Sequence, residues 1–137
     1  MPTVRVTRRV HFSAAHRLHN PAFSDEENVR TFGLCNSPNW HGHNYELDVT
    51  VEGEPDPRTG YVLDLADLRD VANEILADVD HRNLNLDVAW LKDVIPTTEN
   101  LVVALWEQMA PRITGARLAR LVLWETPRNY VEYEGAR

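Results

Sequence analysis

The clearest pattern in the chain is an alternation of side chains over residues 41–52. From residue 45 onward the odd positions are apolar, and the even positions are polar. Successive side chains of a strand point to opposite faces, so this period of two predicts a strand with one buried face. A similar alternation over residues 3–12 predicts another strand, whose apolar face carries Val4, Val6, Val10 and Phe12.

Two segments with apolar residues three and four positions apart predict helices. In the first, Asp64 caps an apolar stripe that lies within residues 65–79. The second opens at Pro96-Thr-Thr-Glu99 and ends at Pro111. Its acid lies in the first turn, where the helix dipole favours negative charge.

The last part of the chain predicts a hairpin. Residues 117–126 read as a strand that is apolar on both faces, residues 127–129 as a turn, and residues 130–134 as the return strand. The order strand, strand, helix, helix, strand, strand predicts an α+β fold, with two helices on one face of an antiparallel sheet. Uncovered sheet edges invite pairing with another chain, which favours an oligomer.

Composition limits the class of protein. A chain of 137 residues that is 43% apolar fits one domain spanning residues 1–137. No apolar run is long enough for a bilayer, no segment resembles a signal peptide, and a single cysteine agrees with a reducing compartment, so we expect a cytoplasmic protein without a membrane partner. The net charge of −7 and the scattered Lys and Arg argue against nucleic acid, but leave an anionic small substrate open.

Three histidines form a candidate metal site. His41 and His43 are two positions apart at the start of the predicted strand, so their imidazoles share one face, and His16 follows the first strand. Three neutral imidazoles with one open coordination position suit catalytic zinc. The alternative is that two are surface histidines and the third is a buried, hydrogen-bonded one.

Cys35 is the only cysteine, and it lies in a stretch from residue 17 to residue 40 without a sustained period. A structureless segment of that length is usually functional or flexible. Its thiol could be a fourth zinc ligand, a base beside the metal, or a buried small hydrophobe. The spacing does not separate these three hypotheses.

Acidic groups supply further candidates. Asp80-His81 follows the first helix and could be an acid–base pair, or a turn cap followed by a histidine at a helix C-terminus. Glu125 ends a strand on the face of Leu121 and Leu123, where it would be either solvated or directed at a ligand. An ionised carboxylate accepts two parallel N–H bonds, which fits the 2-amino-pyrimidinone edge of a guanine or pterin. Trp and Tyr side chains are expected in the core and at interfaces.

Taken together, these motifs resemble the series found in the 6-pyruvoyl-tetrahydropterin synthase family, in the same order and spacing and over essentially the whole chain. The matching segments are Phe12-Ser-Ala-Ala-His16, Cys35-x5-His41-Gly-His-Asn44, Asp80-His81-Arg-Asn-Leu84, Thr97-Thr-Glu-Asn100 and Trp124-Glu-Thr126. The resemblance implies the tunnelling fold, in which trimers close a sheet barrel and two trimers stack into a homohexamer with active sites at subunit interfaces.

The resemblance also implies roles for residues. One zinc ion per subunit would bind His16, His41 and His43, while Cys35, Asp80 and His81 would transfer protons. Glu125 would anchor the pterin, and Thr98 and Glu99 would line its pocket.

The implied reaction makes the protein a carbon–oxygen lyase that eliminates triphosphate from 7,8-dihydroneopterin triphosphate. An internal redox shift leaves a 6-pyruvoyl side chain, so neither nicotinamide nor flavin is needed. Magnesium would enter with the triphosphate.

Two alternatives stay open. The related 6-carboxytetrahydropterin synthases of queuosine synthesis share fold, zinc and substrate. They typically have a shorter Cys-to-His gap, a serine in place of Asn44 and a second cysteine, whereas this chain has a lone Cys35. The other alternative, from a different class, is a binding module that holds zinc with Cys35 as fourth ligand and turns over nothing.

Overall fold

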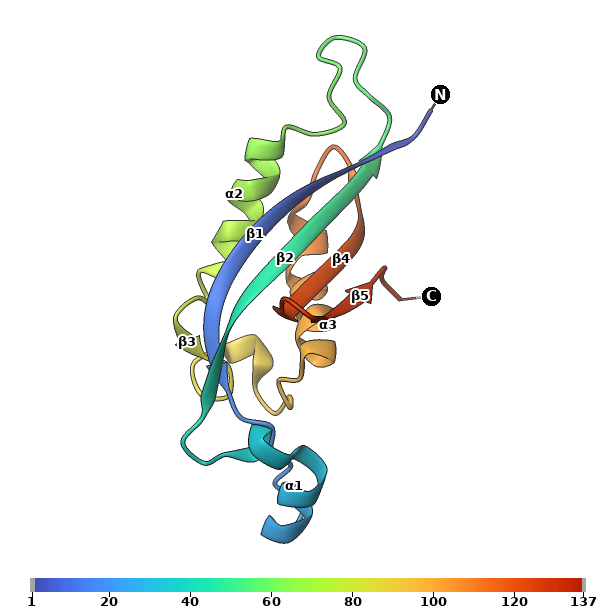
Figure 1. Ribbon diagram of the computed structural model, residues 1–137. Coiled ribbons are helices and arrows are strands. Elements are labelled where there is room, and N and C mark those ends of the chain that lie inside the picture. The colour runs from blue at the N-terminus through green and yellow to red at the C-terminus, as the bar shows by residue number, and fades with distance from the viewer. Residues whose placement is uncertain (1, 137) are drawn as a thin grey trace.

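The two alternating segments pair with each other along their whole length. In the computed structural model, which describes residues 2–136, β1 (Val4–His16) and β2 (His41–Gly53) form an antiparallel ladder. The ladder runs from the pair Val4–Gly53 to the pair His16–His41. These long strands cross the molecule diagonally (Figure 1). Their common end therefore brings His16 and His41 together.

Five strands form one sheet in the order β3-β1-β2-β4-β5. β4 (Arg117–Thr126) pairs antiparallel with β2, and β5 (Asn129–Tyr133) pairs antiparallel with β4. The remaining elements are α1 (Asp25–Phe32), η1 (Gly33–Asn36), α2 (Leu65–Leu76), β3 (Arg82–Asn83), η2 (Ala89–Leu91), α3 (Thr98–Met109) and η3 (Ala110–Arg112).

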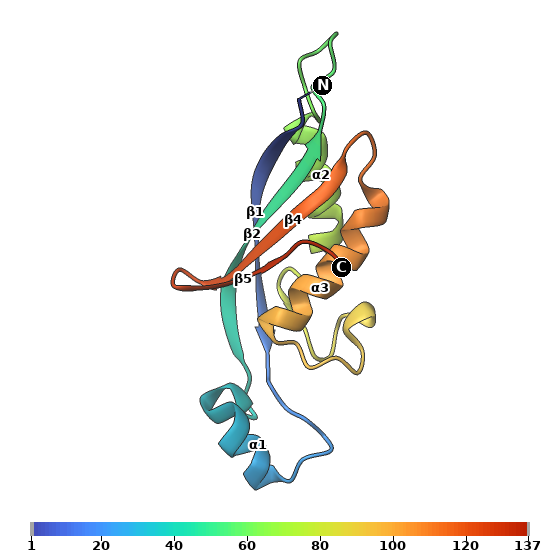
Figure 2. The ribbon, with the colours of Figure 1, turned by 90° about the vertical axis from the view of Figure 1, so that its right-hand side faces the viewer.

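Both long helices cover the same face of the sheet. Figure 2 shows the sheet nearly edge-on, with α2 and α3 on one side of it. The odd residues of β2 between Tyr45 and Val51 are fully buried beneath these helices. The predicted α+β architecture is confirmed, with the core between one sheet face and two helices.

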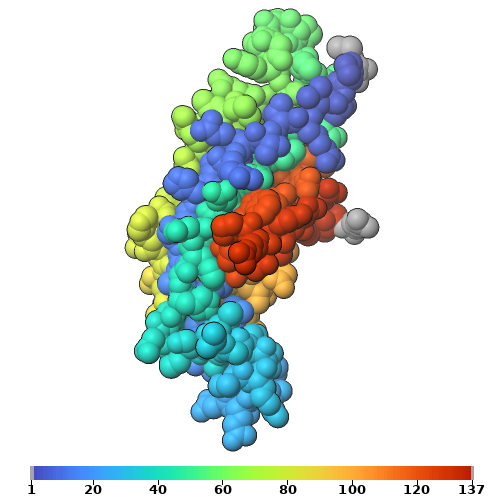
Figure 3. Space-filling view, in the orientation of Figure 1, coloured from blue at the N-terminus to red at the C-terminus, as the bar shows by residue number. Residues whose placement is uncertain are grey.

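The opposite face of the sheet is polar. Arg5 pairs with Glu52 at 3.0 Å, and Arg9 pairs with Asp48 at 2.6 Å. Figure 3 looks onto this face, where β1 and β2 lie beside the β4–β5 hairpin. Cross-strand pairing of opposite charges follows from the alternation, because the polar residues of both strands share this face.

Several boundaries differ from the sequence-based prediction. β1 extends to His16 instead of ending near residue 12, since its partner strand continues to pair with it. β3 was expected to be loop; its two residues pair in parallel with Ala14 and Ala15. The ladder of β4 shifts between Thr50 and Val51, and Leu118 therefore pairs with Val51 and joins the core face. Strict alternation had placed Leu118 on the other face.

The stretch between the first two strands is ordered and contains helix. Ser24 caps α1 by accepting a hydrogen bond from the amide of Glu27, three residues further along the chain. The side chain of Asn28, which is fully buried, accepts from the Asn20 amide and donates to the carbonyl oxygens of Asn20 and Ser24. α1 projects below the sheet in Figure 1. Among residues 2–136, no helix is long and apolar enough to cross a bilayer.

Candidate metal centre and active site

The three predicted ligands converge at the end of the β1–β2 ladder. His16 pairs directly with His41, and His43 lies opposite Ala14, so all three imidazoles are on the helix-covered face. One nitrogen from each ring lies within 4.8 Å of the others. Ideal tetrahedral zinc with Zn–N bonds of about 2.1 Å would need separations of about 3.4 Å, so a modest approach of the rings completes the site.

A backbone carbonyl sets the tautomer of His16. Its Nδ1 lies 2.8 Å from the carbonyl oxygen of Pro96, which can only accept, so Nδ1 carries the proton and Nε2 offers a lone pair to the cluster. This carbonyl was not among the predicted site groups. Burial lowers the pKa of both His16 and His41, which favours the neutral form that binds metals.

These residues fit a metal ion. The Nε2 atoms of His16 and His43, and both ring nitrogens of His41, are buried without a hydrogen-bond partner among the described residues. Buried polar atoms are nearly always paired in folded proteins, so such a set calls for a ligand. Cys35 is not a member of the cluster.

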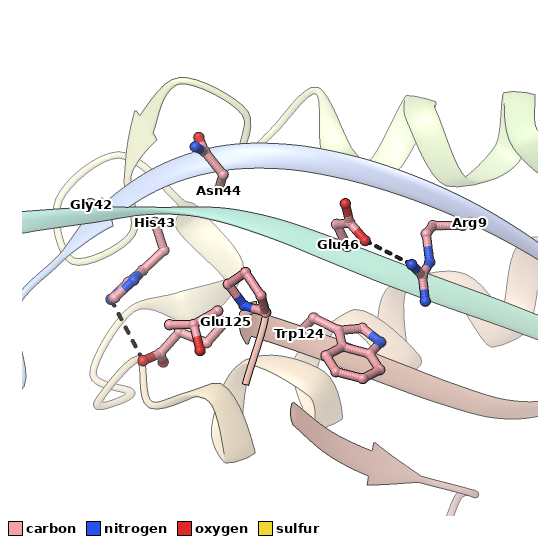
Figure 4. A pocket seen from close by; sticks show the side chains of 9 residues that line it. Arg9, Gly42, His43, Asn44, Glu46, Trp124 and Glu125 are labelled. Atoms are coloured by element: carbon pink, nitrogen blue, oxygen red, sulfur yellow. Dashed lines mark hydrogen bonds and ion pairs between the residues drawn. The ribbon is translucent and has the colours of Figure 1, made fainter. Parts of the chain in front are cut away.

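Glu125 connects the cluster to the start of α3. Its Oε1 lies 3.6 Å from Nε2 of His43, as Figure 4 shows, and its Oε2 accepts a hydrogen bond from the hydroxyl of Thr98. Thr98 is the first residue of α3, capped by Thr97. Glu125, the carboxylate at the end of β4, thus faces the histidine cluster and is held there by Thr98.

Two cavities meet at Glu125. One, of about 580 Å³, is lined by His43, Glu125 and residues of the polar sheet face, including Trp124 (Figure 4). The other, of about 250 Å³, lies between the start of α3 and β5, and Thr98 and Glu99 line it. A ligand at Glu125 can therefore contact both cavities.

Cys35 lies in η1, directly after α1. Its carbonyl oxygen accepts a hydrogen bond of 2.8 Å from the amide of Leu18, two residues after His16. The next side chain, the buried Asn36, donates to the carbonyl oxygen of Leu18 at 2.8 Å and lies 3.0 Å from Nδ1 of His19. The segment that follows the ligand His16 is therefore tied to the segment that carries the thiol.

The side chains of Asp80 and His81 contact each other, with 3.0 Å between Oδ1 and Nδ1. The same carboxylate accepts from the amide of Ser13, and this bond, helped by His81, holds the pKa of Asp80 below its usual value. His81 has a positive φ of 59° and lines a cavity of about 570 Å³, together with residues of β1 and with Gly42, His43 and Asn44 of β2. No hydrogen bond or ion pair within residues 2–136 joins this pair to Cys35.

Tyr45 is a site neighbour that the sequence reasoning assigned to the core. It continues the face of His41 and His43 at the same period of two, a signal that could have included it. Burial, together with the nearby Glu125 and Cys35, raises the pKa of its hydroxyl. The phenol therefore keeps its proton at neutral pH.

Known proteins resemble this chain over nearly its whole length. The sequence profile of 6-pyruvoyl tetrahydropterin synthase matches residues 5–136. The human protein named 6-pyruvoyl tetrahydrobiopterin synthase is 47% identical over 132 residues, covering 96% of this chain and 91% of its own. A dihydroneopterin monophosphate aldolase from Pyrococcus furiosus is 34% identical and covers 95% of this chain and 96% of its own.

A solved structure agrees with the fold. The Caenorhabditis elegans 6-pyruvoyl tetrahydropterin synthase superposes with a TM-score of 0.94 at 43% identity, covering 99% of this chain and 98% of that one. Sequence and structure lead to the same conclusion: the chain belongs to the 6-pyruvoyl tetrahydropterin synthase family.

Proposed function

We propose that this protein is a zinc-dependent 6-pyruvoyl-tetrahydropterin synthase, a lyase that eliminates triphosphate from 7,8-dihydroneopterin triphosphate. The convergence of three histidines beside Glu125, which Thr98 of α3 holds in place, carries the proposal. The names of the human and nematode relatives support the same activity. One cysteine in the chain agrees with a reducing compartment, so we propose the cytoplasm as its location.

The pterin ring would bind at Glu125. With Thr98 donating to one carboxylate oxygen, lone pairs remain for the ring N–H groups of a 2-amino-pyrimidinone. Thr98 and Glu99 line the adjoining cavity of about 250 Å³, which suits a flat bicyclic ring. The side chain at C6 would then lie toward His43.

His16, His41 and His43 would hold the zinc ion. When bound, the ion would act as a Lewis acid that acidifies the C–H bonds beside the substrate hydroxyls. The carbonyl of Pro96 orients His16 for this role. Magnesium, where required, would arrive with the triphosphate.

Proton transfer would fall to Cys35 and to the Asp80–His81 pair. Cys35 lies beside the segment that follows His16, so its thiolate would accept the first proton. Asp80 holds Nδ1 of His81 and leaves Nε2 to exchange a second proton. Because His81 lies at the outer edge of β1, we propose that it serves the Cys35 of a neighbouring subunit in a homohexamer. A monomer by sedimentation would exclude this shared site.

The decisive experiment identifies the product. The purified, zinc-loaded protein is incubated with 7,8-dihydroneopterin triphosphate, and the pterins are analysed by mass spectrometry. A 6-pyruvoyl pterin is expected. A 6-carboxy pterin with acetaldehyde, or a pterin that has lost its side chain, would assign a different reaction to the same site.

The Cys35→Ala variant tests whether Cys35 acts as a catalytic base. It is expected to keep the fold and the zinc and to lose at least about a hundredfold in kcat, the scale of general-base catalysis. Loss of zinc together with turnover would make Cys35 a ligand. A closed four-ligand site without turnover would support the binding module.

A further inference from the structure

The unpartnered polar atoms of the buried interior gather at one place. Among residues 2–136, six buried side-chain N or O atoms lack a hydrogen-bond partner. Four are the nitrogens of the three histidines, and a fifth is the hydroxyl of Tyr45; the sixth is Nε of Arg120 on β4. An unpaired phenol hydroxyl beside nitrogens that would bind a metal ion suggests that a molecule bound at the same site accepts a hydrogen bond from it.

The position of Tyr45 is fixed by its neighbours. It pairs with Phe12 across the β1–β2 ladder, and the two rings stack with 4.7 Å between their centroids at an angle of 7°. On its other side, Tyr45 comes level with Glu125, one step beyond the last ladder pair of β2 and β4. The side chain is fully buried, so it cannot turn its hydroxyl out to solvent.

The ring of Tyr45 also contacts the histidine cluster. Its centroid lies 5.6 Å from that of His43 and 6.3 Å from that of His16, in edge-on arrangements. The ring of Tyr45 therefore packs directly against two of the three histidines. Burial is the main cause of the raised pKa of its hydroxyl, and Glu125 and Cys35, the groups proposed to bind and deprotonate the substrate, add to it.

We propose that the hydroxyl of Tyr45 donates a hydrogen bond to an oxygen on the side chain of the bound pterin, and thereby takes part in catalysis. The proposal rests on the pterin synthase activity proposed above. This oxygen is a hydroxyl oxygen in the substrate and a carbonyl oxygen in the 6-pyruvoyl product. After Cys35 has taken the proton of the neighbouring C–H bond, with the electron pair passing into the pterin ring, the O–H proton leaves in the second transfer, proposed for His81, and negative charge develops on the oxygen. A buried, pre-oriented donor stabilises this charge more than it stabilises the ground state.

Because the hydroxyl of Tyr45 is buried, the proposal predicts a combination of effects on stability and rate that a purely structural tyrosine would not show. In the ligand-free protein the hydroxyl is desolvated and unpaired, which is unfavourable. Replacing it with hydrogen should therefore make the protein more stable while making the reaction slower. A tyrosine that only packs in the core would not show the slower reaction.

The test compares Tyr45→Phe with Tyr133→Phe, both in the zinc-loaded protein. Tyr133 is half-buried on β5, where it packs edge-on against Trp106, away from the histidines. For Tyr45→Phe we expect a Tm about 4 °C higher before substrate is added. We expect kcat to fall about 10- to 100-fold, with KM changed less than threefold. Tyr133→Phe should leave kcat unchanged.

Two further readouts separate other roles. Zinc affinity should stay within twofold of wild type; a tenfold loss would mean that the hydroxyl supports the ligands, and would overturn the proposal. The rate at which iodoacetamide alkylates Cys35, the only cysteine, should also be unchanged. A changed rate would mean that the hydroxyl serves the thiol instead.

The outcomes also separate this inference from the proposed function. Wild-type protein without turnover would overturn the proposed function and this inference with it. Wild-type turnover with an equally active Tyr45→Phe, or with an unchanged or lower Tm, would overturn the inference alone.

Discussion

Asn36 is expected to hold the segment that carries the Cys35 thiol in place, and Asn36→Ala tests this directly. The buried amide donates to the carbonyl oxygen of Leu18 and contacts Nδ1 of His19, at 2.8 Å and 3.0 Å. Alanine removes both contacts and leaves the Leu18 carbonyl without that donor. The backbone bond from Leu18 to Cys35 then has to hold the two segments without this support.

The magnitude follows from these contacts. Leaving one buried acceptor unpaired costs about 1–3 kcal/mol, and the second lost hydrogen bond adds about 1 kcal/mol or less. We take about 2 kcal/mol as the loss in the free energy of opening residues 17–36. At 1.4 kcal/mol per factor of ten, the open population rises about 30-fold.

Alkylation of Cys35 measures this population, because no other thiol is present. The rate with iodoacetamide should rise about 30-fold if the thiol reacts from the open form. Amide exchange should rise over residues 17–36 and not over β2, whereas zinc content should stay constant. The control is Asn39→Ala, an exposed asparagine in the same connection without a side-chain hydrogen bond among the described residues. An alkylation rate within twofold of wild type would refute the positioning role.

Three further predictions concern metal, substrate and pH. Removing zinc by chelation should lower Tm, and adding zinc back should restore it. When free zinc is at a thousandfold excess over its Kd, binding adds about 4 kcal/mol to the free energy of unfolding, which calorimetry can measure. Glu125→Gln should raise KM at least about tenfold and leave zinc affinity unchanged, as titration would show. The Ser13 amide and His81 lower the pKa of Asp80. The contribution of its ionised carboxylate to the free energy of unfolding is therefore present above pH about 4 and lost below. Urea unfolding of Asp80→Asn and wild type should differ by a constant amount from pH 7 to about 4, and the difference should shrink with further acidification.

The sequence predicted the parts of the fold that depend on local patterns. Alternation identified β2, spacing of three and four identified α2 and α3, and Asp64 was predicted as the cap of α2. The same alternation predicted that His41 and His43 share a face. That His16 joins them depended on register, which is fixed only when the two strands pair from Val4 to His16.

What the sequence missed depends on contacts between distant segments. β3 exists because the turn after α2 meets the outer edge of β1, and two residues carry no readable period. The bulge beside Thr50 reverses the face of Leu118, which strict alternation cannot anticipate. The carbonyl of Pro96 contacts His16, which is 80 positions away in the sequence. Every residue has a backbone carbonyl, so no residue type in the sequence indicates this contact.

The rule that buried side chains are either apolar or hydrogen-bonded holds in the middle of β2 and fails at the end of β2 that carries the histidines. Between Leu47 and Val51 the odd residues of β2 are completely buried, whereas at Tyr45 and the histidines five buried polar atoms have no partner. At about 1 kcal/mol each, the lower bound for such atoms, the set costs about 5 kcal/mol, comparable with the whole stability of a small domain. The apolar core must offset this cost in the metal-free protein, and a bound ion must return much of it. Stability and metal binding are therefore coupled, which is why chelation and Tyr45→Phe should move Tm in opposite directions.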